Sequence, residues 1–183
     1  MNVRGVDPLP RNGPRIVLRR LRPADLANFQ AYRSDPDVGR YQSWAPMWSS
    51  GATAFLEEMS AAAFGTMGEW FQLGIAERLT DRLIGDMGVC IRDAEDRHAE
   101  LGVTLAAESQ GRGLGSEAVA QALAMLFESS DVTRVVAITD TRNHATVRLL
   151  QRVGMKLTET LDSEACGQTR SEHVFAIGRH DTQ

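Results

Sequence analysis

The chain has 183 residues, of which 43% are hydrophobic and 24% are charged, and it carries a formal net charge of −4. This composition is typical of a globular protein with one sizeable core, and the negative charge argues against nucleic acid as the main partner. The sequence has no apolar run near the ~18 residues of a membrane span, and its N-terminal stretch lacks the apolar segment of a signal peptide. We therefore expect a cytoplasmic protein without a membrane partner.

The first half of the chain is predicted to begin with a disordered segment, residues 1–13, followed by a single domain over 14–180. Hydrophobic periodicity, helix caps and turn residues define its elements. A polar turn at 78–81 predicts that the strands on either side of it form a hairpin. In chain order, the elements are a strand at 14–21, a helix within 22–36, a helix from about Thr53, and strands at 69–77, 82–92 and 97–106.

The second half alternates helices with strands. Asn143 is a good N-cap for one helix, and Gly154 suits the position just beyond its end. The expected elements are a helix at 116–129, a strand at 132–140, a helix at 143–154, and strands at 156–161 and 172–179. Together they predict one α/β domain of mixed strands with helices between some of them. The histidines and cysteines follow no metal-binding spacing, so no metal is expected.

A glycine-rich stretch, SQGRGLGSEAV, leads directly into a predicted helix and contains Gly111, Gly113 and Gly115. It does not match the GxxxxGK[ST] pattern of a P-loop, and a dinucleotide-binding GxGxxG pattern would need glycine where Ser116 stands. A tight turn by itself explains one or two of the glycines. The remaining interpretation is a Gln-x-x-Gly-x-Gly loop that starts at Gln110, whose backbone N–H groups and helix N-terminus bind a pyrophosphate.

The sequence around this loop resembles the GNAT superfamily of N-acetyltransferases, whose motif A is Gln/Arg-x-x-Gly-x-Gly/Ala. The segment AELGVTLAAESQGRGLGSEAVAQAL is similar to the signature of the RimJ/RimL-type branch, which acetylates ribosomal-protein N-termini and other amines. That branch has typical residues at the positions of Glu100, Gly102, Gln110, Glu117 and Ala118. The similarity covers nearly the whole chain.

Three positions depart from the pattern of this branch. Ala107 stands where proline is usual, Thr146 replaces a serine but keeps a hydroxyl, and Met155 replaces a phenylalanine. The second and third departures conserve the chemical character of the side chain.

The resemblance implies a GNAT fold, an α/β (α+β) mixed sheet of about six to seven strands flanked by about four helices. A V-shaped split would separate the fourth and fifth strands, at 101–105 and 132–139. Acetyl-CoA is the implied cofactor, with its pyrophosphate on the glycine loop and its pantetheine arm along the open strand. Arg112 would add charge to the phosphates unless it is a solvated surface residue. The implied cofactor-binding residues are Leu101, Val103, Thr104, Leu105, Gln110, Gly111, Arg112, Gly113, Leu114, Gly115, Ser116, Asn143 and Thr146.

Two residues are predicted to be catalytic. Glu100 shares a strand face with Gly102 and Thr104, which suits a general base that removes a proton from the acceptor amine. The alternative is a solvated carboxylate on a half-exposed strand. No tyrosine follows Asn143, so Thr146 is predicted to stabilise the departing thiolate, unless it is an ordinary residue of the first helical turn.

The acceptor site is expected in the irregular segment YQSWAPMW, where Tyr41, Trp44 and Trp48 would line a pocket unless the tryptophans cap the core. The implied function is transfer of an acetyl group to a primary amine on a protein N-terminus or a small molecule. An aminoglycoside or polyamine acetyltransferase, a silent acyl-CoA-binding module and a nicotinamide-dependent oxidoreductase are the alternatives. Dimers are common in this branch, so a homodimer is also compatible with the resemblance.

Overall fold

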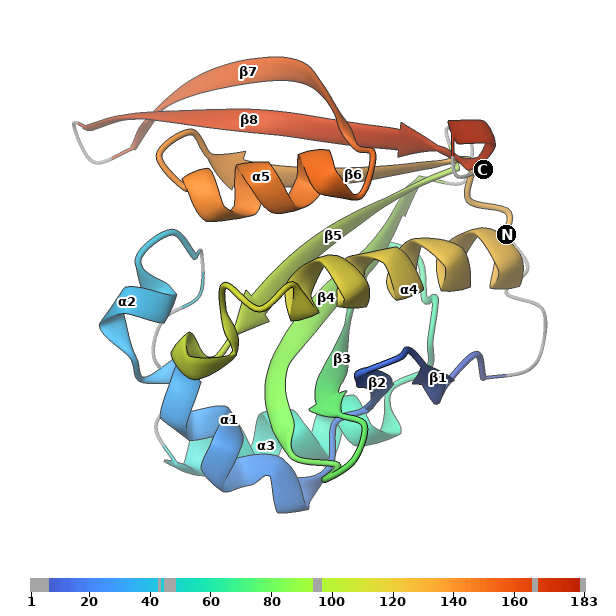
Figure 1. Cartoon of the computed structure of the whole chain (residues 1–183), viewed down its shortest axis with the longest axis vertical. Helices are drawn as coiled ribbons and strands as arrows, with labels where there is room; N and C mark the ends of the chain where they lie inside the picture. Colours follow the sequence, from blue (N-terminus) through green and yellow to red (C-terminus); the bar gives the residue numbers. More distant parts are fainter. Residues whose placement is uncertain (1–6, 43, 45–48, 94–96, 166–167, 182–183) are drawn as a thin grey trace.

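The structure, a computed structural model, describes residues 7–42, 44, 49–93, 97–165 and 168–181. The described strands form one mixed sheet in the order β1-β2-β3-β4-β5-β6-β8-β7 (Figure 1). β5 and β6 are parallel, and the other neighbouring strands are antiparallel. The strands are β1 (Arg11–Asn12), β2 (Ile16–Arg20), β3 (Trp70–Glu77), β4 (Leu83–Asp93), β5 (His98–Leu105), β6 (Arg134–Asp140), β7 (Lys156–Ala165) and β8 (Gln168–Gly178).

The predicted mixed α/β architecture is confirmed, but the sheet has eight strands in place of six to seven. The additional strand is β1, in which Arg11 lies opposite Leu18 and Asn12 lies opposite Val17 of β2. The expectation that residues 1–13 are disordered is therefore wrong for β1, while residues 1–6 lie outside the described part. A two-residue strand carries no periodicity, so the sequence pattern could not reveal it.

The structure describes five α-helices, whereas about four were predicted. The additional helix is the one-turn helix α2, which the sequence pattern did not predict. Its local signals are clear: Pro36 occupies the first helical turn, and the Asp35 carboxylate accepts a hydrogen bond of 2.9 Å from the backbone N–H of Asp37. The helices are α1 (Leu26–Arg33), α2 (Pro36–Gly39), α3 (Ser49–Ala61), α4 (Leu114–Ser129) and α5 (His144–Arg152). None of the described helices is long and apolar enough to cross a membrane.

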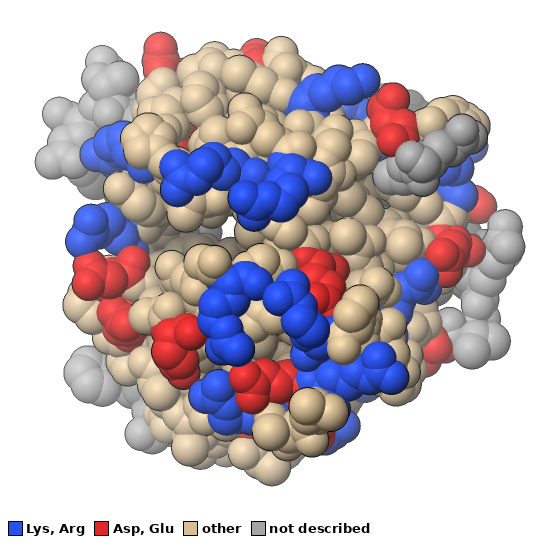
Figure 2. Space-filling view, in the orientation of Figure 1, with Lys and Arg blue, Asp and Glu red and all other residues tan. Residues whose placement is uncertain are grey.

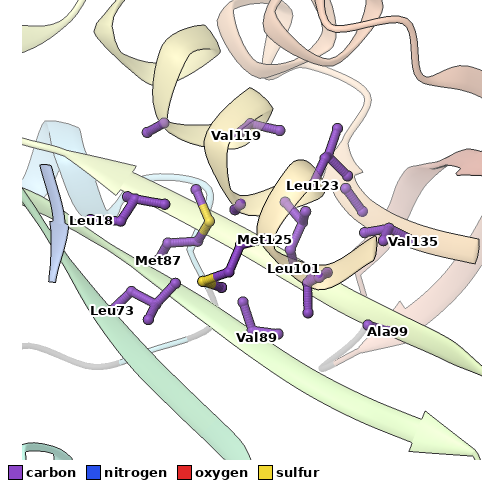
Figure 3. Close-up of a cluster of buried hydrophobic side chains, with 14 of the residues drawn as sticks. Leu18, Leu73, Met87, Val89, Ala99, Leu101, Val119, Leu123, Met125 and Val135 are labelled. Carbon is purple, nitrogen blue, oxygen red and sulfur yellow. The ribbon is translucent and has the colours of Figure 1, made fainter. Parts of the chain in front are cut away.

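The main hydrophobic core lies between the sheet and α4. Figure 3 shows Leu73, Met87 and Leu101 of the sheet meeting Leu123 and Met125 of α4, and all five side chains are buried. A second cluster joins α1 and α3 to the sheet. Because side chains alternate along a strand, α4 and α1 cover opposite faces of β4.

The sheet opens between β5 and β6. These two strands pair only from His98 to Glu100, opposite Arg134 to Val136, and then diverge (Figure 1). Beyond that point β5 continues alongside β4 as far as Leu105, and β6 continues alongside β8. These are the two strands between which the split is expected, and β1 shifts their place in the order from fourth and fifth to fifth and sixth.

Candidate functional site

A cavity of about 430 Å³ lies where β5 parts from β6. Its walls come from α2 and the residues after it, the end of β5, the glycine loop, the start of α4 and one side of α5. The space-filling view shows a hollow between α4 and α5 (Figure 2). Of the residues predicted from the sequence, those that line the cavity are Tyr41, Val103, Thr104, Leu105, Gln110, Gly111, Gly113, Leu114, Gly115, Ser116, Asn143 and Thr146.

The edge of β5 that faces the split presents backbone carbonyls to side chains instead of to a neighbouring strand. The amide nitrogen of Gln42 lies 3.4 Å from the carbonyl oxygen of Val103. The amide of Gln110 donates a hydrogen bond of 2.9 Å to the carbonyl oxygen of Leu105. Since these two carbonyls are two residues apart, they lie on the same edge, which is available for pairing with an extended ligand.

Two of the three loop glycines are explained by their backbone conformation. Gly111 has a φ of 70° and Gly113 a φ of 78°, a region that residues with a Cβ rarely adopt. Gly113 is the N-cap of α4, so the free N–H groups of the first helical turn face the cavity. At Gly115 glycine is required for lack of space, because a Cβ there would lie 2.7 Å from Cδ1 of Leu149 on α5. It permits close packing of α4 against α5.

Positive charge surrounds this helix N-terminus. Arg148 and Arg152 lie one turn apart on α5, both line the cavity, and neither forms an ion pair with a described residue. Lys and Arg side chains gather on both sides of the hollow in Figure 2. The hydroxyl of Ser109, which is fully buried in the cavity wall, has no hydrogen-bond partner among the described residues. Free N–H groups, two guanidinium groups without a described carboxylate partner and an unsatisfied hydroxyl together fit a polyanionic ligand.

Glu117 fastens the start of α4 to β2. Its carboxylate accepts hydrogen bonds from the backbone N–H groups of Arg15, at 2.7 Å, and Ile16, at 3.1 Å, and from the Arg15 side chain at 2.8 Å. Burial by itself would raise the pKa of Glu117, but these hydrogen bonds and the Arg15 charge outweigh it and hold the pKa below its ordinary value. The signature glutamate of the helix therefore has a structural role.

The N-terminus of α5 forms the opposite wall. The side-chain oxygen of Asn143 accepts a hydrogen bond of 3.2 Å from the backbone N–H of Thr146, so Asn143 is the N-cap that the sequence predicts. Both side chains line the cavity, which leaves the Asn143 amide group and the Thr146 hydroxyl on the side of a ligand.

Glu100 lies apart from the cavity lining. As predicted, it shares a face of β5 with Gly102 and Thr104, but Arg92 of β4 holds its carboxylate, with Nη2 2.7 Å and Nε 2.8 Å from Oε2. The guanidinium of Arg92 in turn lies 5.1 Å from the ring centroid of Trp70. Direct contact between Glu100 and a ligand in the cavity is therefore not part of this arrangement.

Three further predicted residues do not line the cavity. The side chain of Leu101 is buried in the main core, and Arg112 is exposed on the loop, where its carbonyl accepts a hydrogen bond of 2.9 Å from Arg15. Trp44 is half-buried beneath Arg33 of α1, whose guanidinium lies 4.4 Å from its ring. Trp48 lies outside the described residues.

A buried charged network beside the site was not predicted. Arg33 forms a two-pronged ion pair with Asp86 of β4 at 2.8 to 3.0 Å, and both side chains are almost fully buried. Tyr32 donates a hydrogen bond of 2.7 Å to the same carboxylate, and burial and then the Asp86 charge raise the pKa of Tyr32 well above its ordinary value. The network anchors the end of α1, from which α2 and the cavity wall follow. The available signal was an aspartate within the otherwise apolar run from Leu83 to Ile91.

Among the described residues, no group of three or more histidine, cysteine, aspartate or glutamate side chains is arranged to hold a metal ion. Eight further described residues that line the cavity were not predicted from the sequence. They are Asp37, Val38, Gln42, Ser109, Ala145, Arg148, Leu149 and Arg152.

The comparisons with known proteins agree with this geometry. Residues 15–156 match the family model described as acetyltransferase (GNAT) domain. The uncharacterized N-acetyltransferase p20 of Bacillus licheniformis is 27% identical over 166 residues, which are 89% of this chain and 92% of that protein.

Two solved structures share the fold. A GNAT-family acetyltransferase from Bacillus anthracis has a TM-score of 0.83 at 18% identity, over 94% of this chain and 99% of that one. Spermidine N-acetyltransferase from Vibrio cholerae, solved in complex with CoA and spermine, has a TM-score of 0.78 at 17% identity, over 93% of this chain and 99% of that one. GNAT acetyltransferases use acetyl-CoA, and the cavity described above has the features that such a ligand requires. Because the family model covers most of the chain and the fold agrees with it, the protein belongs to the GNAT acetyltransferase family.

Proposed function

We propose that this protein is an N-acetyltransferase that transfers the acetyl group of acetyl-CoA directly to a primary amine within a ternary complex. The observation that carries the proposal is the cavity itself. It joins the open edge of β5 to the N-terminus of α4 and to the unpaired cations Arg148 and Arg152. An acidic protein can hold a polyanionic cofactor in this way because the positive charge is local.

The chain offers separate groups to each part of the cofactor. The N–H groups at the start of α4, exposed by the positive φ at Gly111 and Gly113, would hold the pyrophosphate, with Arg148 and Arg152 adding charge. The open edge around Val103 would pair with the pantetheine arm. When bound, acetyl-CoA supplies an activated acetyl group as a thioester.

The proposed base is Glu100, acting through water. Glu100, Gly102 and Thr104 alternate onto one face of β5, and Thr104 also reaches the cavity lining. A Cβ built on Gly102 would meet nothing within 4 Å, so there is room for water between the carboxylate and the cavity. A Glu100→Gln variant should lower turnover mainly at low pH, where the amine is more fully protonated, and should keep its CoA affinity. An unchanged pH–rate profile removes Glu100 from the mechanism.

The wall formed by α5 would contact the reacting end of the cofactor. The Asn143 amide group would donate a hydrogen bond to the pantetheine, and the Thr146 hydroxyl would stabilise the sulfur, since both residues line the cavity. The acceptor side would be formed by α2 and the segment after it, in which Trp44 lies against Arg33. The RimJ/RimL-type branch, the cytoplasmic location and a homodimer remain predictions from the sequence.

The acceptor is proposed to be a primary amine on a protein N-terminus or a small molecule. Asp37 is the one carboxylate among the described residues that line the cavity, and it lies in α2 at the acceptor side. A carboxylate there suits a cationic acceptor, although Arg40 pairs with it at 2.5 Å. The structural similarity to spermidine N-acetyltransferase of Vibrio cholerae keeps a polyamine acceptor as the second candidate.

The test is to mix the protein with acetyl-CoA and three acceptors: a peptide with a free N-terminus, spermidine and an aminoglycoside. Release of free thiol, and an acetylated product in mass spectrometry, is the expected result, with an N-acetylated peptide as the matched control. CoA binding without thiol release from any acceptor would instead indicate a silent acyl-CoA-binding module. Thermal stabilisation by a nicotinamide cofactor and none by CoA would point to an oxidoreductase.

A further inference from the structure

The chain has two tyrosines, and the structure gives them different environments. Tyr32 is 3% exposed and its hydroxyl is committed to Asp86 at 2.7 Å. Tyr41 is half-buried and lines the cavity. Only the phenol of Tyr41 is therefore in a position to meet a ligand.

Tyr41 lies on the side of the cavity where the sheet opens. The next residue, Gln42, extends its amide to the carbonyl of Val103 on the open edge of β5, at 3.4 Å. Asn143 and Thr146 form the facing wall. The segment after α2 thus lies beside the stretch of β5 along which an extended thioester would pair.

Two cations lie close to the Tyr41 ring. The guanidinium carbon of Arg142, which precedes α5, is 5.8 Å from the ring centroid. Arg40 lies next to Tyr41 in the chain, and its hydrogen bonds to Asp37, first, and to Tyr41 raise the pKa of Arg40. Each of these arginines is also paired with a carboxylate, Arg40 with Asp37 and Arg142 with Asp140, so the ring lies against two ion pairs.

The reaction requires a proton donor for the departing sulfur. When the amine attacks the acetyl carbonyl, a C–N bond forms, the C–S bond breaks, and sulfur leaves with the electron pair. A free thiol has a pKa of about 8.5 and a phenol about 10, so proton transfer between them is nearly balanced. Tyr41 carries the one phenol among the described residues that line the cavity, and the hydroxyls of serine and threonine are much weaker acids than a phenol.

We propose that Tyr41 is the general acid of the acetyl transfer, donating its phenol proton to the departing sulfur from the α2 side of the cavity. The proposal rests on the function proposed above. The phenolate regains a proton from solvent, and the attacking nitrogen loses its own proton through water, so the sum is amine plus thioester giving amide plus thiol. Tyr41 lies about a hundred residues before Thr146, the α5 residue predicted from the sequence to stabilise the departing sulfur.

The first test is binding and does not depend on turnover. Calorimetric titration at about pH 8 compares CoA with desulfo-CoA, which lacks the sulfur, in the wild type and in Tyr41→Phe. We expect the wild type to bind CoA several-fold more tightly than desulfo-CoA, and the variant to lose this preference while its desulfo-CoA affinity is unchanged. The same preference in both proteins overturns the proposal.

The second test is kinetic. Tyr41→Phe should lower kcat by about 10² with the acceptor KM almost unchanged, because loss of a general acid removes transition-state stabilisation. Replacing Tyr41 by 3-fluorotyrosine, a stronger acid, should move the alkaline limb of the pH–rate profile to lower pH. A raised KM at wild-type kcat would make Tyr41 an acceptor-binding residue, and a kcat loss found in Thr146→Val but not in Tyr41→Phe would give the role to α5. Either result overturns the proposal.

The two tests also separate this proposal from the proposed function. A wild type that releases no thiol with any amine contradicts acetyl transfer, and the CoA comparison then still decides whether Tyr41 contacts the sulfur. Turnover in the wild type, together with an unaffected Tyr41→Phe variant, contradicts only the role of Tyr41. Urea unfolding of the variant establishes that it is folded.

Discussion

Replacing Gly85 by alanine should damage both stability and the cofactor site. Gly85 lies in β4 opposite Leu105, and a Cβ built on it would be 2.2 Å from the carbonyl oxygen of Thr104 and 3.0 Å from Cα of Leu105. Close C···O contacts in sheets are about 3.3 Å, so β5 must move away by about 1 Å. Overpacking costs typically ~1–3 kcal/mol, and because the opposing atoms are backbone, we expect the upper end, about 3 kcal/mol.

The neighbouring strand offers a matched control. A Cβ added to Gly102 of β5 would meet nothing within 4 Å, so Gly102→Ala should be neutral or gain about 0.5 kcal/mol from the reduced freedom of the unfolded chain. Urea unfolding followed by circular dichroism measures both free energies of unfolding. Since Thr104 and Leu105 line the cavity, Gly85→Ala should also weaken CoA binding. A Gly85→Ala protein within about 1 kcal/mol of the wild type, or equal losses in both variants, would refute this reasoning.

Five other substitutions have expected outcomes. Gly113→Ala places a Cβ at a φ of 78° and should lose about 1–2 kcal/mol in urea unfolding, together with CoA affinity in calorimetric titration. Arg148→Gln and Arg152→Gln should each raise the acetyl-CoA KM and flatten its dependence on salt, and a KM equal to that of the wild type at low and high salt contradicts the charge argument. Asp86→Ala leaves a buried guanidinium without its partner and should lose about 3–5 kcal/mol of unfolding free energy, whereas a loss below about 1 kcal/mol would show the pair to be dispensable. The pKa of Glu117 in the folded protein lies below the ordinary value of about 4.3. Its contribution to stability is therefore present above that pH and is lost as the pH falls through the folded pKa. On acidification below about pH 4, Glu117→Gln should lose less stability than the wild type.

Much of the fold followed from local signals in the sequence. The strand at 97–106 and the helix at 116–129 were predicted close to their observed bounds, because a two-residue or 3.6-residue repeat of apolar side chains is a property of the segment itself. The loop between them was predicted for a similar reason, since Gly111 and Gly113 hold backbone conformations that glycine adopts readily.

The predictions were weaker where a residue's role depends on a partner in another segment. Glu100 was placed on the correct face of its strand, but its ion pair with Arg92 comes from the neighbouring strand. Gly115 was assigned to a phosphate, although its small size serves the packing of α4 against Leu149 of α5. Nothing in the pattern around Gln42 indicates that its amide reaches the edge of β5.

The sequence by itself determined the order of most elements, the glycine loop, the cap at Asn143 and the family, because these depend on local conformation and on motifs that lie close together in the chain. Only the tertiary structure decided which side chains share the cavity. The splay of β5 from β6 brings the α2 segment with Tyr41, the loop at Gly113 and the α5 cations Arg148 and Arg152 to one place. Such proximity results from sheet pairing and helix packing between distant segments, which no local pattern of residues specifies.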